Sequence, residues 1–138
     1  NTNDMFEIKN VKCVSYKQYS QKMNEFINLY KHFSTNSYQL ELICIVRWMC
    51  VYEYMKKHDI SRAFICDSDV LIYDNINNFD NKYLKDYDFM LCSSPSKNVT
   101  GGQSIWNIEK LEKFIEFIFN FYKTQINNIE LFFKNQTS

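Results

Sequence analysis

Glycine and proline are scarce in this sequence, which contains two glycines and one proline, all between residues 95 and 102. A dinucleotide-binding turn of the GxGxxG type needs three spaced glycines, and a phosphate-binding P-loop needs two spaced glycines ahead of a lysine. The sequence therefore excludes both nucleotide-binding motifs. Histidine is equally scarce: His32 and His58 lie far apart, which excludes the HExxH motif of zinc proteases.

No charge of either sign is in excess, because sixteen lysines and arginines balance sixteen aspartates and glutamates. A neutral chain has no net attraction for a phosphate backbone or an anionic membrane surface, so we expect no nucleic-acid partner. Long hydrophobic runs are also missing, since the most apolar stretch, residues 42–55, includes Arg47 and Glu53 and is too short to span a bilayer. We expect a cytoplasmic protein with no transmembrane segment in this chain.

Cysteine occurs five times without a CxxC pair, which disfavours a zinc site or a disulfide framework. We expect reduced, buried thiols. Hydrophobic residues make up 46% of the 138 residues, enough to fill one core. Residues 1–138 are therefore expected to form a single domain.

Hydrophobic periodicity predicts helices alternating with short buried strands, the pattern of an α/β fold. Ser37 or Asn36 can cap the longest helix, whose apolar residues on nearly all sides imply burial, and Asn107 can cap the last helix. The expected elements are helices over residues 38–57 and 108–122, a weak helix over 19–30, short strands over 62–66 and 87–92, and a kinked strand over 6–16.

The strand expected over residues 62–66 runs directly into Asp67-Ser68-Asp69. Ligands of open α/β sheets bind beyond the carboxyl ends of the strands. Two carboxylates this close repel each other unless a cation neutralises them, and Mn²⁺ or Mg²⁺ prefers such oxygen ligands together with substrate phosphates. Asp67 and Asp69 are therefore predicted to bind Mn²⁺ or Mg²⁺ and a diphosphate. The alternative is a strand-end turn whose carboxylates cap backbone N–H groups.

Asp86-Tyr87-Asp88 also fits the DxD pattern. Its context differs, because Asp86 follows Lys85 in a polar connector, whereas Asp67 follows an apolar run and leads into Val70-Leu71-Ile72.

Arg47 is a second indication of a site. Its neighbours three and four positions away on the expected helix are all apolar or cysteine, so no carboxylate on the same helix face can pair with it. A buried guanidinium without a partner is costly. We expect its partner to be a ligand phosphate or one of the aspartates, unless the side chain extends to solvent.

Gly101 and Gly102 are a third indication, because they stand together in a chain that otherwise lacks glycine. They follow an expected strand, where a positive φ angle or a close approach of the backbone to a ligand would require glycine. The alternative is an ordinary turn that leads into the last helix.

Residues 47–76 and 100–118, taken together, resemble the nucleotide-diphospho-sugar transferases, which are metal-dependent glycosyltransferases of the GT-A fold. The resemblance covers roughly residues 38–122 and rests on three features in order: an arginine-bearing helix, an apolar strand that ends in DSD, and a glycine-containing segment before an amphipathic helix. It implies an α/β fold with a mixed, open, Rossmann-like sheet and helices on both faces. Because we identify neither a preceding strand that grips the base nor a later histidine ligand, we expect a truncated, partial domain.

The resemblance also implies a set of functional residues. Asp67 and Asp69 would hold Mn²⁺ or Mg²⁺ against the diphosphate of a nucleotide-sugar donor, whose sugar passes to a glycan, protein or lipid acceptor. No catalytic base can be assigned from the sequence. The donor-binding residues it implies are Arg47, Asp67, Ser68, Asp69, Gly101, Gly102 and Gln103.

Two other functions fit part of the pattern. A haloacid-dehalogenase-like phosphatase would use Asp67 as its nucleophile, but such enzymes carry their DxD motif near the N-terminus, followed by Gly-Thr or a similar pair rather than Val70-Leu71. A non-catalytic remnant that binds a sugar nucleotide is the third possibility.

Overall fold

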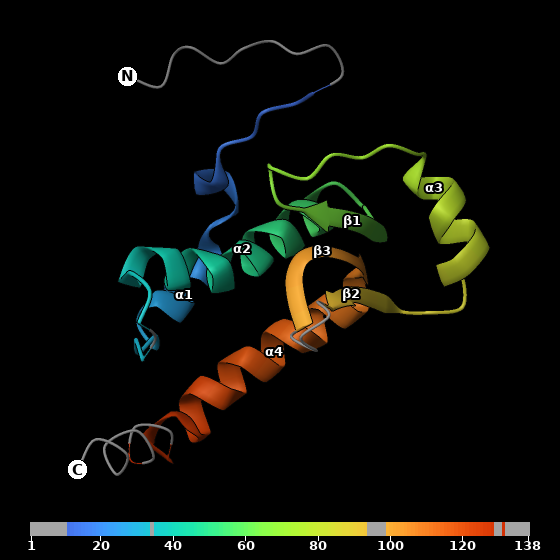
Figure 1. Cartoon of the computed structure of the whole chain (residues 1–138). Coiled ribbons are helices and arrows are strands. Elements are labelled where there is room, and N and C mark those ends of the chain that lie inside the picture. Colours follow the sequence, from blue (N-terminus) through green and yellow to red (C-terminus); the bar gives the residue numbers. More distant parts are fainter. Residues whose placement is uncertain (1–10, 34, 94–98, 129–130, 132–138) are drawn as a thin grey trace.

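The computed structural model describes residues 11–33, 35–93, 99–128 and 131 (Figure 1). It is a mixture of helix and strand, as expected. The elements are the 3₁₀ helix η1 (Tyr16–Tyr19), α1 (Gln21–Ile27), α2 (Tyr38–Lys57), β1 (Arg62–Cys66), α3 (Ile76–Phe79), the π-helical turn η2 (Asp80–Leu84), β2 (Phe89–Ser93), β3 (Val99–Asn107) and α4 (Ile108–Thr124).

The three strands form one sheet in the order β1-β3-β2. Both pairs are antiparallel, with Ser104 of β3 opposite Ile65 of β1 and Leu91 of β2, and the register shifts after Leu91. The resemblance to GT-A enzymes implies a mixed sheet, whereas every strand pair in the described part of the chain is antiparallel. This difference arises because residues 99–107 form a long strand, β3, that returns between the other two.

Each face of the sheet is covered differently. Ala63, Ile65, Leu91 and Trp106 pack against the hydrophobic core formed with α2 and α4. The opposite face is lined by the connection after β1 and by helix α3, which together form a shallow groove over residues 70–79. Figure 1 shows α2 and α4 as the two long helices beside the strands, with α3 and η2 on the side away from α1.

Helix α2 begins and ends as its local sequence dictates. The Ser37 hydroxyl accepts a hydrogen bond from the Leu40 backbone N–H at 3.3 Å, which confirms the predicted cap. At the other end, Asp59 has a φ angle of 52°, and the Ile60 N–H donates to the Met55 carbonyl oxygen at 2.9 Å. This left-handed residue ends the helix and turns the chain into β1.

The expectation that α2 is buried on nearly all sides is wrong for its first two turns. Met49, Tyr52 and Met55 are buried, whereas Leu40 is 52% exposed and Ile43 is 61% exposed. The exposed residues lie along one side of the helix, where they border a cleft rather than another element.

Helix α4 covers the sheet with Leu111 and Ile115, which are both almost completely buried. Asn107 stands at the predicted cap position, but its side chain makes no capping hydrogen bond. Its amide oxygen accepts from Arg62 at 2.7 Å, and its amide nitrogen donates to Asp88 at 3.4 Å. Asn107 therefore ties the start of α4 to both outer strands.

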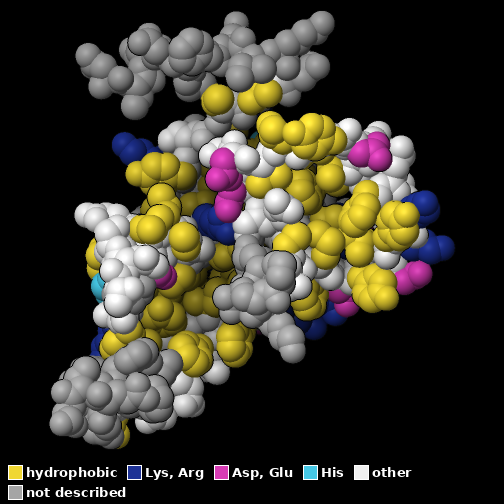
Figure 2. All heavy atoms as spheres, in the orientation of Figure 1, with side chains coloured by type: hydrophobic (Ala, Val, Ile, Leu, Met, Phe, Trp, Pro, Cys, Tyr) yellow, Lys and Arg dark blue, Asp and Glu magenta, His cyan; other side chains and the backbone are white. Residues whose placement is uncertain are grey.

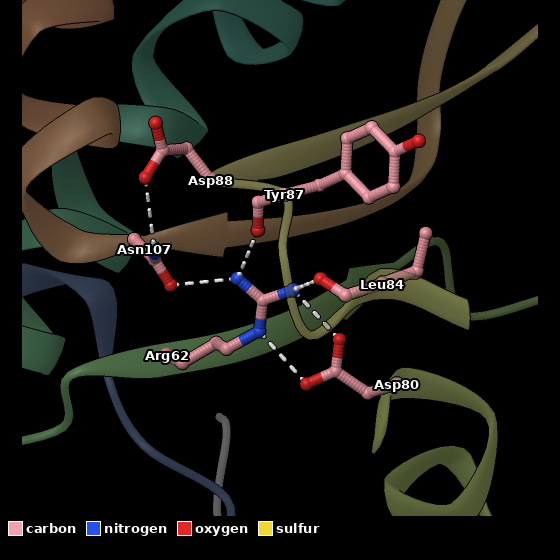
Figure 3. Close-up of polar contacts among 6 residues, drawn as sticks. All are labelled: Arg62, Asp80, Leu84, Tyr87, Asp88 and Asn107. Carbon is pink, nitrogen blue, oxygen red and sulfur yellow. Dashed lines mark hydrogen bonds and ion pairs between the residues drawn. The ribbon is translucent and has the colours of Figure 1, made fainter. Parts of the chain in front are cut away.

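Arg62 joins four segments of the chain at the edge of the sheet (Figure 3). Its guanidinium donates to both carboxylate oxygens of Asp80 at 2.6 and 2.8 Å, and to the backbone carbonyl oxygens of Tyr87 and Leu84. With the bond to Asn107, all three guanidinium nitrogens are satisfied. This network fixes η2 and the entry to β2 against β1.

The region before α2 departs from the sequence prediction. Residues 6–10 of the expected kinked strand lie outside the described residues, and residues 11–15 are irregular and lead into η1. The weak helix predicted over 19–30 is present as α1. The Glu53 carboxylate accepts hydrogen bonds from the backbone N–H groups of Gln21 and Lys22 at 3.2 and 2.6 Å, so α2 caps the start of α1.

The five cysteines are free thiols, as expected. The prediction that they are buried is wrong. Cys13, Cys44 and Cys66 are exposed and Cys50 and Cys92 are half-buried, because neighbouring apolar residues in the sequence do not guarantee an inward-facing position. Within the described residues, no helix has the length and hydropathy needed to cross a membrane.

Candidate functional site

The Asp67-Ser68-Asp69 segment forms a turn directly beyond the carboxyl end of β1, as the sequence predicts. The Asp67 backbone N–H donates to the Gly102 carbonyl oxygen at 2.9 Å, which fastens the turn to β3. The Val70 N–H donates to the Asp67 carbonyl oxygen at 3.2 Å and closes the turn. The backbone of the motif is therefore held in place by one hydrogen bond within the turn and one hydrogen bond to β3.

This turn borders a cleft of about 870 Å³ between α2, α4 and the sheet. Of the predicted donor-binding residues, the cleft brings together Arg47, Asp67, Ser68, Asp69 and Gly102. The rest of its wall consists of Leu40, Ile43, Cys44, Trp48, Leu91, Trp106 and Phe114. Figure 2 shows many hydrophobic side chains at the surface, with acidic and basic groups both visible near the middle of the view.

A smaller hollow of about 260 Å³ continues from the same turn. It is lined by Asp67 and Asp69 and by Gln103, whose side-chain oxygen accepts a hydrogen bond from the Cys92 thiol at 3.5 Å. Asp67 and Asp69 therefore line both hollows, whereas Gln103 lies at the second one. Gly101 is a residue of β3.

Gly101 and Gly102 lie within β3. The alternative that they form an ordinary turn leading into the last helix is therefore wrong. Gly102 has no positive φ angle, so the left-handed conformation is not its role. At Gly102 the second explanation, close approach, agrees with the structure: the residue lines the cleft while its carbonyl binds the Asp67 turn. A side chain there would project into the space beside the carboxylates.

Arg47 projects from α2 into the cleft and forms an ion pair with Asp67. Its side chain is 30% exposed and that of Asp67 is 45% exposed. The guanidinium carbon lies 4.7 Å from the centre of the Trp48 ring, within the range of a cation–π contact. The Arg47 Nε atom is buried and has no hydrogen-bond partner among the described residues.

The expectation that the partner of Arg47 comes from another segment is therefore correct, and that partner is Asp67. Its other predicted role, binding a ligand phosphate, is compatible with this position because the pair stands at the wall of an open cleft. Asp88 of the second DxD triplet is occupied elsewhere, by Lys110 at 2.8 Å.

Sequence reasoning missed the aromatic part of the cleft. Trp48 and Trp106 lie with ring centres 5.9 Å apart, and Phe114 of α4 stacks on Trp106 at 5.1 Å. The Trp106 Nε1 atom and the nearby Ser104 hydroxyl are buried without a hydrogen-bond partner. The signal was present, because Gly102, Ser104 and Trp106 alternate along one face once residues 99–107 are read as a strand.

The donor chemistry of the turn suits a hard divalent cation. Asp69 and Ser68 are exposed, and Asp67 is partly exposed, so oxygen ligands are open to solvent. Among the described residues, no group of three His, Cys, Asp or Glu side chains gathers in one place. A cation held by Asp67 and Asp69 would therefore complete its coordination with water and with oxygens of a bound ligand, as Mg²⁺ commonly does.

Comparisons of this chain with protein-family models, with curated proteins and with solved structures found no match. The function of the site has therefore to be inferred from its own residues.

Proposed function

We propose that this chain belongs to a metal-dependent glycosyltransferase, which moves a sugar from a nucleotide-diphosphate donor to a glycan, protein or lipid acceptor. The observation that carries this proposal is the DSD turn beyond β1, whose two aspartates line an open cleft that Arg47 also lines. Carboxylates for a cation and a guanidinium for phosphate are the two kinds of group that bind a diphosphate.

The residues of the turn support cation binding on electrostatic grounds. Asp67 and Asp69 are separated by one residue, and the cost of bringing two carboxylates together falls when a divalent ion lies between them. Arg47 neutralises part of the charge of Asp67, whereas Asp69 is exposed. The site has room for a ligand of nucleotide size, since the cleft measures about 870 Å³.

Transfer breaks the bond between the anomeric carbon of the sugar and the oxygen of the diphosphate, and forms a bond from that carbon to an acceptor oxygen. Negative charge develops on the departing diphosphate, and Arg47 would stabilise that charge with its guanidinium N–H groups. A bound divalent cation supplies Lewis-acid stabilisation of the same charge. Asp67 and Asp69 would hold and orient the diphosphate through that cation.

For the fold, we propose the GT-A type, with the described sheet as one part of a larger mixed sheet that has helices on both faces. Its support is the order of the elements: the arginine-bearing helix α2, the strand β1 with its terminal DSD turn, and the strand β3 that leads into α4.

The proposal is tested by thermal unfolding in the presence of uridine or guanosine diphosphate, each with and without Mn²⁺. We expect a rise in the melting temperature only when nucleotide and Mn²⁺ are both present, because ligand that binds the folded state alone stabilises it. Asp69→Asn should abolish the rise, while Asp86→Asn, in the other DxD triplet, should keep it. No nucleotide-dependent shift with Mn²⁺ would reject the proposal.

The same preparations distinguish the phosphatase alternative. A phosphatase that uses Asp67 as its nucleophile should hydrolyse a generic phosphomonoester and lose that activity in Asp67→Asn. A transferase should show no such hydrolysis, and it should retain nucleotide-dependent stabilisation with Mn²⁺.

A further inference from the structure

Two arginines are partly buried in this chain, and their surroundings differ. Arg62 has hydrogen-bond acceptors for Nε and for both terminal nitrogens of its guanidinium. Among the described residues, a terminal nitrogen of Arg47 donates to the Asp67 carboxylate. The buried Nε atom of Arg47 has no hydrogen-bond partner among these residues. Arg62 is therefore fully engaged in holding the fold, whereas Arg47 keeps unused hydrogen-bonding capacity beside an open cleft.

The carboxylate that Arg47 occupies is one of the two that the proposed function assigns to a divalent cation. A guanidinium beside Asp67 neutralises part of the negative charge that would attract a cation to this carboxylate. It also repels a cation that binds to the same carboxylate. While the ion pair is intact, Arg47 and a cation cannot both have the full attraction of Asp67.

We infer that Arg47 is a built-in competitor of the metal ion for Asp67, and that a bound diphosphate relieves this competition by taking over the guanidinium. The inference rests on the proposed function for the identity of the diphosphate, but the competition itself concerns only Arg47, Asp67 and the cation. Metal and diphosphate therefore bind cooperatively. The metal ion alone binds weakly, because Arg47 occupies Asp67. A bound diphosphate draws Arg47 away, and both carboxylates then become available to the metal ion.

The position of Arg47 allows this exchange of partners. Its guanidinium lies over the ring of Trp48, a planar surface that supports the cation without fixing its hydrogen bonds. Its side chain is 30% exposed toward the cleft, so a short rotation can present N–H groups to a phosphate. A phosphate that accepts two such bonds after this rotation can also satisfy the Nε atom, for which the described residues provide no hydrogen-bond partner.

Equilibrium linkage gives the sizes to expect. If diphosphate raises the affinity for metal by a given factor, metal raises the affinity for diphosphate by the same factor, and such couplings are typically about 5-fold to 150-fold. Removing the Arg47 charge should therefore tighten the binding of metal alone by roughly fivefold or more, while it weakens the binding of diphosphate in the presence of metal.

The test is a titration of Mn²⁺ alone, followed by the loss of the free-ion electron paramagnetic resonance signal, on the wild-type chain and on Arg47→Gln. Lys57→Gln is the matched control, because it removes the same charge from the far end of α2. Arg47→Met is a second variant that keeps an apolar stem over Trp48, for use if the glutamine variant does not fold. We expect tighter Mn²⁺ binding in the Arg47 variant and no change in the Lys57 variant.

Unchanged or weaker Mn²⁺ binding in both Arg47 variants would overturn the competition. A parallel thermal-unfolding series with uridine or guanosine diphosphate at saturating Mn²⁺ separates this outcome from failure of the proposed function. If the wild-type chain is stabilised by nucleotide but Arg47 variants bind Mn²⁺ no more tightly, the inference fails and the proposed function stands. If neither nucleotide stabilises the wild-type chain at any Mn²⁺ concentration, the proposed function fails. The titration with Mn²⁺ alone still tests whether Arg47 competes with the metal ion for Asp67.

Discussion

The guanidinium of Arg47 on α2 and the carboxylate of Asp67 beyond β1 form an ion pair at the wall of the cleft. The pair joins the longest helix to the DSD turn, which the Asp67 N–H also fastens to Gly102 of β3. Three separate segments therefore meet at Asp67, α2 at its carboxylate and β3 at its backbone N–H. Removal of either charge should change what the cleft binds more than it changes the fold, because both side chains are partly open to solvent.

Arg47→Leu should weaken the binding of a nucleotide diphosphate with Mn²⁺ by roughly tenfold or more, since hydrogen bonds to a charged group contribute about 1.5–3 kcal/mol. The free energy of unfolding should fall by less than about 1 kcal/mol, the range of exposed ion pairs. Calorimetric titration and urea unfolding measure the two effects separately. A collapse of stability with unchanged affinity in the folded fraction would assign Arg47 to the fold alone.

Arg62→Gln should have the opposite effects. Its guanidinium joins β1 to Asp80 and Asn107 and to two backbone carbonyl oxygens, so the variant leaves several acceptors without a donor. We expect a loss of about 1–3 kcal/mol in the free energy of unfolding, with nucleotide affinity preserved in the folded fraction. Urea unfolding at neutral pH checks the first value. A variant as stable as the wild type would show that the network contributes nothing to stability.

The pH dependence of stability should reflect the same network. The Arg62 guanidinium lowers the pKa of the Asp80 carboxyl from its ordinary value. The folded state therefore holds the ionised form more strongly than the unfolded state does, and this stabilisation is present above the ordinary aspartate pKa of about 3.9. It disappears as the pH falls through the lowered pKa of the folded state.

Asp80→Asn removes that contribution, so the wild-type and variant melting temperatures should differ most near neutral pH. They should converge in acid, as the wild-type carboxyl becomes protonated. Melting curves recorded from pH 7 down to about pH 2.5 test this. A difference that stays constant across the range would mean that ionisation of Asp80 contributes no stability.

Two substitutions in α4 test the packing of this helix against the sheet. Leu111 is fully buried, so Leu111→Ala should leave a cavity and cost about 2–5 kcal/mol in the free energy of unfolding. Phe117 lies on the same helix but is 62% exposed, and Phe117→Ala should change stability by about 0.5 kcal/mol or less. Chemical denaturation of both variants provides the comparison. Equal losses would contradict the packing described for α4.

Glu53 offers a test of how α1 is attached. Its carboxylate accepts hydrogen bonds from the backbone N–H groups of Gln21 and Lys22, which otherwise have no partner at a helix start. Glu53→Ala should cost about 0.5–2 kcal/mol, as loss of a helix cap does. Amide hydrogen exchange should accelerate at residues 21 and 22 in this variant. Glu116→Ala, at an exposed position on α4, should leave that exchange unchanged.

Local sequence signals were enough to predict several elements of the fold. Helix α2 has the predicted bounds because Ser37 supplies a cap at one end and the chain leaves helical geometry at Asp59. Strand β1 ends at Cys66 as predicted, because the apolar run stops at two aspartates that cannot enter the core. Strand β2 and helix α4 also follow from apolar runs of the right period.

Features that depend on distant contacts could not be predicted. Strand β3 begins in a glycine-containing segment that reads as a loop, and only pairing with β1 and β2 makes it a strand. The first two turns of α2 read as buried, but Leu40 and Ile43 face a cleft whose existence depends on where α4 packs. For the site, the sequence indicated Arg47 and the DSD motif, whereas Trp106 required the register of β3.

The most direct measurement of the central claim is anomalous diffraction from crystals soaked with Mn²⁺ and uridine diphosphate. We expect an anomalous peak within coordination distance of carboxylate oxygens of Asp67 and Asp69 and of both phosphates, with the Arg47 guanidinium moved from Asp67 to the diphosphate. A diphosphate bound in the cleft without a metal at these carboxylates, or a metal peak at a different place, would contradict the claim.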